Sequence, residues 1–391
     1  MDKSFPNPEH SGKIFSFCAV CVLAVTFIAA LIPSTGGPFD AYAGIVLSQG
    51  SILACVLIFC AICKVNVLKA TKTNTVMPDA KAASASVIIG IVIATAVMIP
   101  LMFAIEGFNA LGYNPSRSFD LGGNNAANII LQLALCCVLP GIVEEMLFRG
   151  IMLRGLRKFG DAFAIIVSAL LFSLFHCNAV QTVFPFIAGL VLGLIFVKTG
   201  NLVFCMIAHA LNNAMSILYD VWLNKYIMQS TVLLKMNTFY ITVFEVIAGV
   251  ICLLVLAACL FVLFKTKTVK EEVPEDFDEA NQQPAVFNPY GGIFRPVQQD
   301  EQLQINQPPS YDHRKNLSVQ EQQLSQYPFS GPPREEDVPR SANQYPEYNQ
   351  RYNKQMKNAT RRTFFLWALG GIIFFALFWV LDFLDGVYHF L

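Results

Sequence analysis

Nine long apolar runs constrain this chain more than any other feature of its sequence. Each is long enough, or nearly so, to cross the roughly 30 Å hydrocarbon core of a bilayer. Only 14% of the residues are charged and 55% are hydrophobic, which is far more apolar than a soluble domain. Because backbone groups inside a bilayer must bond within their own segment, such runs form helices. We expect an all-α fold, a polytopic transmembrane helical bundle of about eight to nine spans. The runs are approximately 14–33, 44–63, 84–104, 127–148, 162–177, 181–198, 201–222, 239–264 and 364–383.

The spacing of these runs divides the chain into five parts. The first run has no small-residue cleavage site after a short apolar core, so we interpret it as a retained span. Residues 265–362 are rich in Gln, Pro, Asn and charge, and they lack apolar periodicity, so we expect a long disordered linker that can recruit an unknown protein partner. The parts are an N-terminal two-span hairpin (1–80), a five-span core (84–222), an additional span (239–264), the polar linker (265–362) and a C-terminal span (363–391).

Positive charges in the short loops predict the orientation of the chain in the membrane. Lysines cluster between the second and third runs, arginines follow the fourth run, and basic residues flank the polar linker. The positive-inside rule then places the N-terminus and residues 265–362 in the cytosol. We expect a multi-pass protein of the cell (plasma) membrane, with the lipid bilayer and no nucleic acid among its partners.

Two adjacent glutamates, Glu144 and Glu145, lie near the end of the fourth run and are followed by Arg149. Residues four apart share one helix face, so Glu145 can pair with Arg149 and Glu144 points elsewhere. A desolvated carboxylate of this kind suits a general base, and charges at bilayer depth are functional-site candidates. The alternative is an ion pair at the cytosolic helix end with one glutamate reaching the interface.

Two of the five histidines lie within apolar runs of the core. His176 ends the fifth run four residues after Phe172, and His209 lies in the seventh run four residues before Asn213. A single intramembrane histidine is often a hydrogen bond between helices. Two of them with a free glutamate favour a site that holds water or a metal ion.

These residue types supply what water attack on an amide carbonyl requires. Glu144 would be the base, His176 and His209 would hold water or a metal, and the amide of Asn213 would donate to a developing oxyanion. The His-Glu-x-x-His motif of soluble zinc peptidases is absent from the sequence. A Zn²⁺ ion held by His176, His209 and Glu144 would need three helices, and metal-free activation of water is the alternative.

The ordered motifs Glu144-Glu-x-x-x-Arg149, Phe172-x-x-x-His176 and His209-x-x-x-Asn213 together resemble the CPBP family. This family contains the CAAX proteases, bacteriocin-processing and self-immunity proteins, and relatives of the type II CAAX prenyl protease. The resemblance covers about residues 127–220 and implies an intramembrane endopeptidase. In it Glu144 activates water with help from His176, and His209 and Asn213 bind the water, a metal or the oxyanion. Glu145, Arg149 and Phe172 would support the site.

We therefore predict a membrane metalloendopeptidase that hydrolyses a peptide bond in a membrane-associated peptide or protein. Two other functions remain open. The first is a catalytically inactive immunity or scaffold protein that acts through its linker, and the second is a proton-coupled transporter with Glu144 and the histidines as the relay. Convergence of Glu144 with both histidines also requires that the fourth helix continue beyond Arg149 and that the fifth segment end within the membrane, with residues 178–182 as buried irregular backbone.

Overall fold

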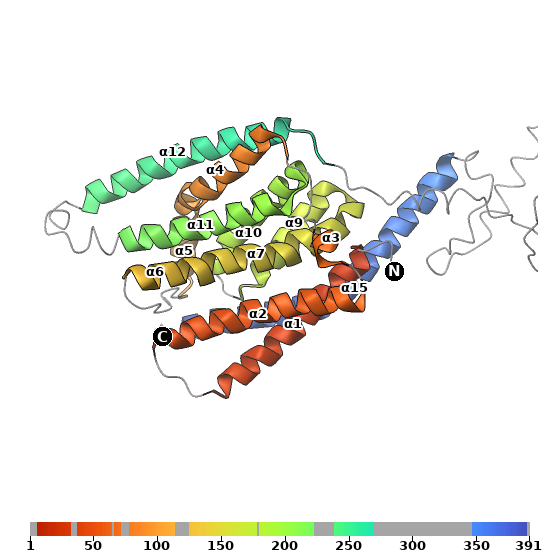
Figure 1. Ribbon diagram of the computed structural model, residues 1–391, viewed down its shortest axis with the longest axis horizontal. Coiled ribbons are helices and arrows are strands. Elements are labelled where there is room, and N and C mark those ends of the chain that lie inside the picture. Colours follow the sequence, from red (N-terminus) through yellow and green to blue (C-terminus); the bar gives the residue numbers. More distant parts are fainter. Residues whose placement is uncertain are drawn as a thin grey trace, which may run out of the picture. The chain divides into compact units, whose positions relative to one another are not determined.

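The computed structural model describes residues 6–32, 37–64, 66–71, 78–113, 125–177, 180–222, 238–269 and 346–388. The regular elements in these ranges are all helices, which confirms the predicted all-α class (Figure 1). Residues 270–345, most of the predicted disordered linker, lie outside the described ranges.

The helices occur in three groups along the chain. The first group is α1 (Pro8–Ala30), α2 (Pro38–Ile62), α3 (Val67–Thr71), α4 (Ala80–Ala96) and α5 (Met98–Ala110). The second is one continuous helical run made of α6 (Ala126–Gln132), η1 (Leu133–Val138), α7 (Leu139–Glu145), η2 (Met146–Leu153), α8 (Arg154–Leu156) and η3 (Arg157–Phe159). The third is α9 (Asp161–Leu174), α10 (Val180–Thr199), α11 (Leu202–Trp222), α12 (Thr238–Lys265) and α15 (Pro346–Tyr388).

Seven of the described helices are long and apolar enough to cross a membrane, by length and composition. They are α1, α2, the run 126–159, α10, α11, α12 and α15. The two remaining predicted spans correspond to the shorter apolar helices α4 and α9. The chain is a multi-pass membrane protein, and its described part contains seven such helices and two shorter ones.

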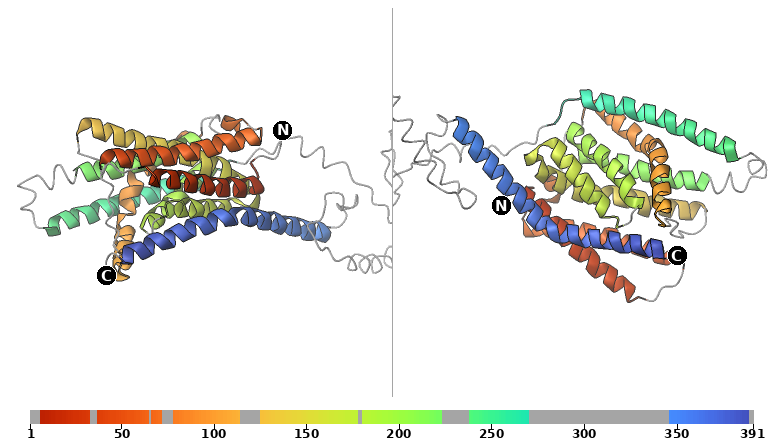
Figure 2. Two further views of the ribbon diagram at one scale, coloured as in Figure 1. Left: turned by 90° about the horizontal axis from the view of Figure 1, so that it is seen from below. Right: turned by 180° about the vertical axis from the view of Figure 1, so that it is seen from behind.

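The predicted span 84–104 is broken. Helix α4 ends at Ala96, and α5 begins at Met98 after a turn at Val97. The sequence gives a reason for the break, because Pro100 has no N–H to donate to the carbonyl four residues earlier. Figure 2 shows the chain changing direction between the two helices.

The helical run that corresponds to the predicted span 127–148 is longer than predicted. The helical run continues past Arg149 to Phe159 and ends at Gly160, whose φ of +107° favours glycine. Two π-helical segments, η1 and η2, lie on either side of α7, and such segments are frequent at functional sites. The continuation confirms the geometry that convergence of the site residues required.

Helix α9 has 14 residues, so it is about 21 Å long and too short to cross the hydrocarbon core. The helix ends at Leu174, before the predicted limit of 177. His176 lies in the turn that follows α9, and Cys177 has a φ of +51°. Asn178 and Ala179 lie outside the described residues, so the predicted irregular backbone there stays a prediction, whereas residues 180–182 already belong to α10.

The described parts of Met1–Glu272 and Arg361–Leu391 form one compact unit. The predicted disordered linker extends to residue 362. The final helix, however, starts at Pro346, so residues 346–362 are helical. Within the unit α15 packs on α1, where the rings of Phe15 and Phe375 lie 5.4 Å apart. A Cβ atom at Gly12 would lie 2.6 Å from the Phe364 carbonyl oxygen, so glycine permits the close approach.

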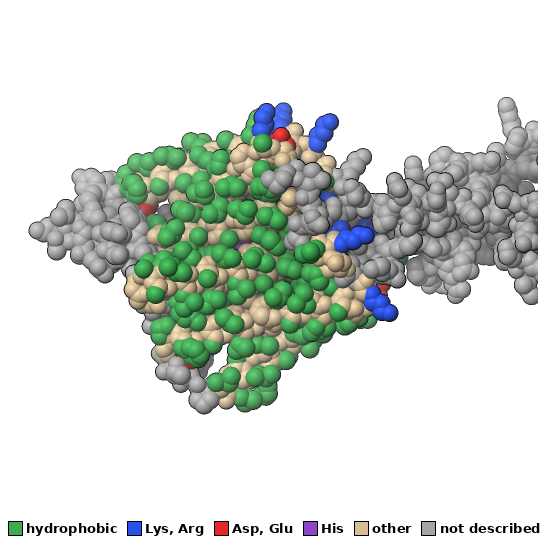
Figure 3. All heavy atoms as spheres, in the orientation of Figure 1, with side chains coloured by type: hydrophobic (Ala, Val, Ile, Leu, Met, Phe, Trp, Pro, Cys, Tyr) green, Lys and Arg blue, Asp and Glu red, His purple; other side chains and the backbone are tan. Residues whose placement is uncertain are grey.

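Basic side chains from several helices meet at one end of the unit. Arg154 donates to the carbonyls of Lys69 and Ala70, Arg157 donates to that of Val269, and Lys198 donates to that of Thr266. Figure 3 shows lysine and arginine side chains gathered at this end of an otherwise largely apolar face. The charges flank the apolar helices as they would beside a bilayer.

Small residues allow the helices around the core to pack closely. A Cβ atom at Gly90 of α4 would lie 2.7 Å from the Cα of Ala208 in α11, and one at Gly189 of α10 would lie 2.9 Å from the Cβ of Ala169 in α9. Glycine at these two positions therefore permits the close approach of the helices.

Replacing Gly90 with valine should separate α4 from α11 and lower the free energy of unfolding by roughly 1–3 kcal/mol. The measurement is the thermal unfolding midpoint of purified protein in detergent. Gly44→Val on α2 is the matched control, because a Cβ atom there meets nothing within 4 Å. Equal midpoints for the two variants would contradict the packing argument.

Candidate active site

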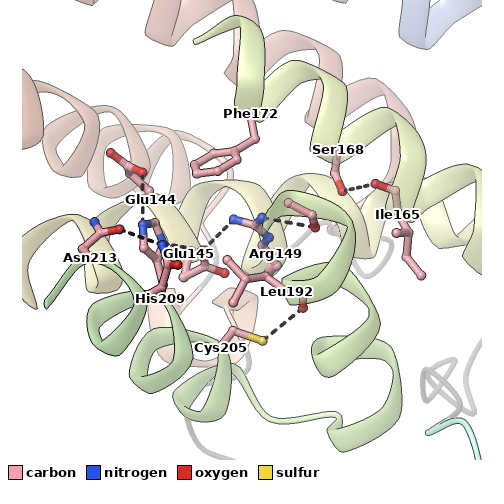
Figure 4. Close-up of polar contacts among 12 residues, drawn as sticks. Glu144, Glu145, Arg149, Ile165, Ser168, Phe172, Leu192, Cys205, His209 and Asn213 are labelled. Atoms are coloured by element: carbon pink, nitrogen blue, oxygen red, sulfur yellow. Dashed lines mark hydrogen bonds and ion pairs between the residues drawn. The ribbon is translucent and has the colours of Figure 1, made fainter. Parts of the chain in front are cut away.

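Four helical segments bring the predicted site residues together. Helix α7 carries Glu144 and Glu145, and η2 carries Arg149. The end of α9 positions Phe172 and His176, and α11 carries His209 and Asn213. Helix α7 packs between α11 and α2 (Figure 1). Figure 4 shows Glu144, Glu145, Arg149, Phe172, His209 and Asn213 in one cluster.

Glu145 is the centre of a buried charged network. Its Oε1 accepts from Nη1 of Arg149 at 2.5 Å and from Nδ1 of His209 at 2.8 Å. Glu145 and Arg149 are both 0% exposed. The pair predicted from the four-residue spacing is therefore present, and it extends to a histidine of another helix.

The guanidinium of Arg149 is enclosed by two further groups. Its Nη2 donates to the carbonyl of Gly189 at 3.3 Å, and its carbon lies 4.5 Å from the centre of the Phe172 ring. The ring of Phe172 also contacts both histidines, edge to face, at 5.1 Å from His176 and 5.8 Å from His209. Phe172 therefore fixes the relative positions of the arginine and the two imidazoles.

Glu144 points away from this pair, as predicted. Its Oε1 accepts from Nε2 of Gln49 in α2 at 2.7 Å. Its Oε2 lies 3.9 Å from Nε2 of His209, which is too far for a direct hydrogen bond. Glu144 is 7% exposed, so it is a nearly buried carboxylate with one oxygen held and the other facing an imidazole.

The hydrogen bonds assign the tautomers of the two imidazoles. A carboxylate and a carbonyl oxygen only accept, so the Nδ1 atom that each histidine directs to such an oxygen carries the proton. For His209 the partner is Glu145, and for His176 it is the Phe172 carbonyl at 3.0 Å. In the neutral rings both Nε2 atoms are then unprotonated, and that of His209 faces Glu144.

Asn213 lies on the same face of α11 as His209 and forms hydrogen bonds to two other residues. Its Nδ2 donates to the carbonyl of Cys136 at 3.0 Å, and its Oδ1 accepts from Asn212 at 3.1 Å. A primary amide has two N–H groups. One N–H of Asn213 holds η1, and the other can donate to a further acceptor.

The unprotonated imidazole nitrogens and the Glu144 carboxylate are chemically suitable ligands for Zn²⁺. Among the described residues, however, no three His, Cys, Asp or Glu side chains are placed to hold a metal ion. We therefore assign no step to a metal, and the zinc site formed by Glu144, His176 and His209 stays a prediction.

Sequence reasoning missed Gln49. It is the only side-chain amide in the apolar run 44–63, and that isolation was the available signal. Its contact with Glu144 depends on the packing of α2 against α7, which the sequence does not specify.

Replacing Arg149 with methionine should lower the free energy of unfolding by about 3–5 kcal/mol, because Glu145 would remain buried without its cation. The second change Glu145→Gln should recover part of this loss, since the buried charge is then removed. The measurement is the thermal unfolding midpoint in detergent. Glu9→Gln is the control, because Glu9 forms an exposed pair with Lys13 and such pairs contribute little. A loss after Arg149→Met no larger than that of the control would contradict this account of the network.

Comparison with known proteins gives one match. The family model described as type II CAAX prenyl endopeptidase Rce1-like matches residues 126–215, from the start of α6 to within α11. No curated protein and no solved structure matches the chain. The matched segment contains Glu144, Glu145, Arg149, Phe172, His176, His209 and Asn213. Residues 126–215 thus carry a domain of the Rce1-like family of type II CAAX prenyl endopeptidases, which confirms the CAAX-protease family that the three motifs indicate.

Proposed function

We propose that this protein is an intramembrane endopeptidase in which Glu144 activates a water molecule for attack on a peptide carbonyl. The observation that carries the proposal is the 3.9 Å separation between Oε2 of Glu144 and Nε2 of His209. Both atoms are hydrogen-bond acceptors. A water molecule about 2.8 Å from each could donate one hydrogen to each acceptor.

A water held in this way has its lone pairs free. With a peptide carbonyl above it, the water oxygen forms a bond to the carbonyl carbon while Oε2 of Glu144 takes the proton. The carbonyl oxygen becomes an oxyanion. The second N–H of Asn213 is suited to stabilise that charge.

Collapse of the tetrahedral intermediate completes the reaction. The carbon–nitrogen bond breaks, and the proton on Glu144 passes to the leaving amine. The products are one peptide with a new carboxyl group and one with a new amine, and Glu144 is again ionised. The unprotonated Nε2 of His176 can accept a proton during this exchange, which agrees with the supporting role that the family resemblance implies.

The network of Glu145, Arg149 and His209 supports this step. Since Glu145 holds the proton of His209 on Nδ1, the Nε2 atom remains an acceptor for the water. The site lies on helices of a multi-pass membrane protein, so we infer that the substrate is a membrane-associated peptide or protein.

The protease function predicts that Glu144→Gln and His209→Ala each abolish cleavage. The first change removes the base and the second removes the other acceptor of the water, so each should lower the rate by at least about 100-fold. The measurement is cleavage of a membrane-tethered peptide library by purified protein in detergent. Glu245→Gln is the matched control, because Glu245 is also a carboxylate within a long apolar helix, α12, where it accepts a hydrogen bond from the Tyr219 hydroxyl at 2.5 Å.

The same assay decides the metal question. Loss of wild-type cleavage with a chelator and recovery with Zn²⁺ would establish metal dependence, and full activity in chelator would establish metal-free water activation. A wild type that cleaves no member of a broad library would overturn the protease proposal. The inactive scaffold would then take its place, whereas uptake driven by a pH gradient would indicate the transporter. The family match favours proteolysis over both.

We further propose that the end with the basic residues faces the cytosol of a cell whose plasma membrane holds the protein, which also places the N-terminus and residues 265–362 in the cytosol. A membrane-impermeant maleimide should label Lys267→Cys only from the cytosolic side. Asn109→Cys, in the exposed part of α5, should be labelled from the opposite side. Labelling of both variants from one side would contradict this orientation.

A further inference from the structure

Gln49 forms a hydrogen bond to Glu144 from outside the matched family segment. It lies in α2, and its Nε2 is 2.7 Å from Oε1 of Glu144. Gln49 is 8% exposed and Glu144 is 7% exposed. A hydrogen bond between an amide and a carboxylate is charge-assisted, and in this buried position water does not compete with it.

The contact defines which atom of the amide faces the carboxylate. A carboxylate only accepts, so the N–H group of Gln49 must point to it. The amide oxygen, Oε1 of Gln49, is buried and has no hydrogen-bond partner within the described part of the chain. An apolar side chain would fill this position without that desolvation penalty, so packing alone does not account for a glutamine.

Helix α2 is held at a fixed position relative to α7. The N-terminal hairpin contacts the helical run 126–159 at two further points. Thr71 of α3 lies against Gly150, and Ser11 of α1 lies against Gly155. The Ser11 hydroxyl is also 3.3 Å from the carbonyl oxygen of Met152 in η2. The amide of Gln49 is therefore presented to Glu144 by a rigid support.

We propose that Gln49 is the positioning residue for the catalytic base, so that the N-terminal hairpin completes the active site of the family domain. By holding Oε1 of Glu144, Gln49 directs Oε2 toward His209, where the attacking water is placed. This inference rests on the proposed protease function.

The test is Gln49→Met in the full-length protein, assayed with the same tethered peptides. Methionine has a similar length and no N–H, so the carboxylate would lose its fixed orientation. We expect kcat to fall roughly 10- to 100-fold, KM to stay within about twofold, and the unfolding midpoint to match that of the wild type. Gln49→Asn keeps the amide on a shorter stem and should retain an intermediate kcat; it also serves if the methionine variant fails to fold.

Two controls separate positioning from structure. Ser51→Ala removes a buried hydroxyl of the same helix that donates to the carbonyl of Ser48, and it should leave kcat unchanged. In a Glu144→Gln background, Gln49→Met should not reduce the residual rate further, because the base it positions is already absent.

Each outcome has one meaning. Full activity of Gln49→Met, with Glu144→Gln inactive, would overturn the positioning role and leave the protease proposal intact. Activity that falls only in proportion to folded protein, or a further loss in the Glu144→Gln background, would assign Gln49 a structural role and overturn the inference. A wild type without cleavage would overturn both proposals.

Discussion

The site depends on a charged pair that is completely removed from solvent. Glu145 and Arg149 are both 0% exposed, and burying such charges costs several kcal/mol for each ion unless they are paired and hydrogen-bonded. The pairing is incomplete, since Oε2 of Glu145 and Nε of Arg149 have no hydrogen-bond partner among the described residues. A buried ion pair of this kind adds little net free energy of unfolding, although removal of one partner is costly. Its position beside His209 is consistent with a role in orienting that imidazole.

The lengths of two helical segments place the polar residues around this pair. The helical run 126–159 is long and contains π-helical turns on either side of Glu144 and Glu145, so the two carboxylates stay well inside the run. Helix α9 is short, which leaves His176 at the level of the site and not at the far surface. Phe172 then contacts the guanidinium and both imidazoles. Two of the departures from regular full-length spans, the extended run 126–159 and the short helix α9, are thus found where the polar residues converge.

The family domain does not make all of the contacts to its own site residues. Gln49 and the glycine contacts at Gly150 and Gly155 come from the N-terminal hairpin, and α15 packs on α1. The hairpin packs against α7 and η2. The helices outside residues 126–215 therefore determine the environment of Glu144 as well as the stability of the bundle.

The sequence alone determined the helical class, the membrane setting and the pairing of Glu145 with Arg149, because these follow from apolar run length and from helix periodicity within one segment. It also indicated the family, since three ordered motifs lie within one block. The tertiary structure decided which helices are too short for a full span and how far the helical run that contains α7 and η2 extends. It also decided that Gln49 contacts Glu144. Those features depend on contacts between segments far apart in the chain. A glutamine in an apolar run has the same local sequence whether it faces lipid, a neighbouring helix or a buried carboxylate, and only packing distinguishes the three.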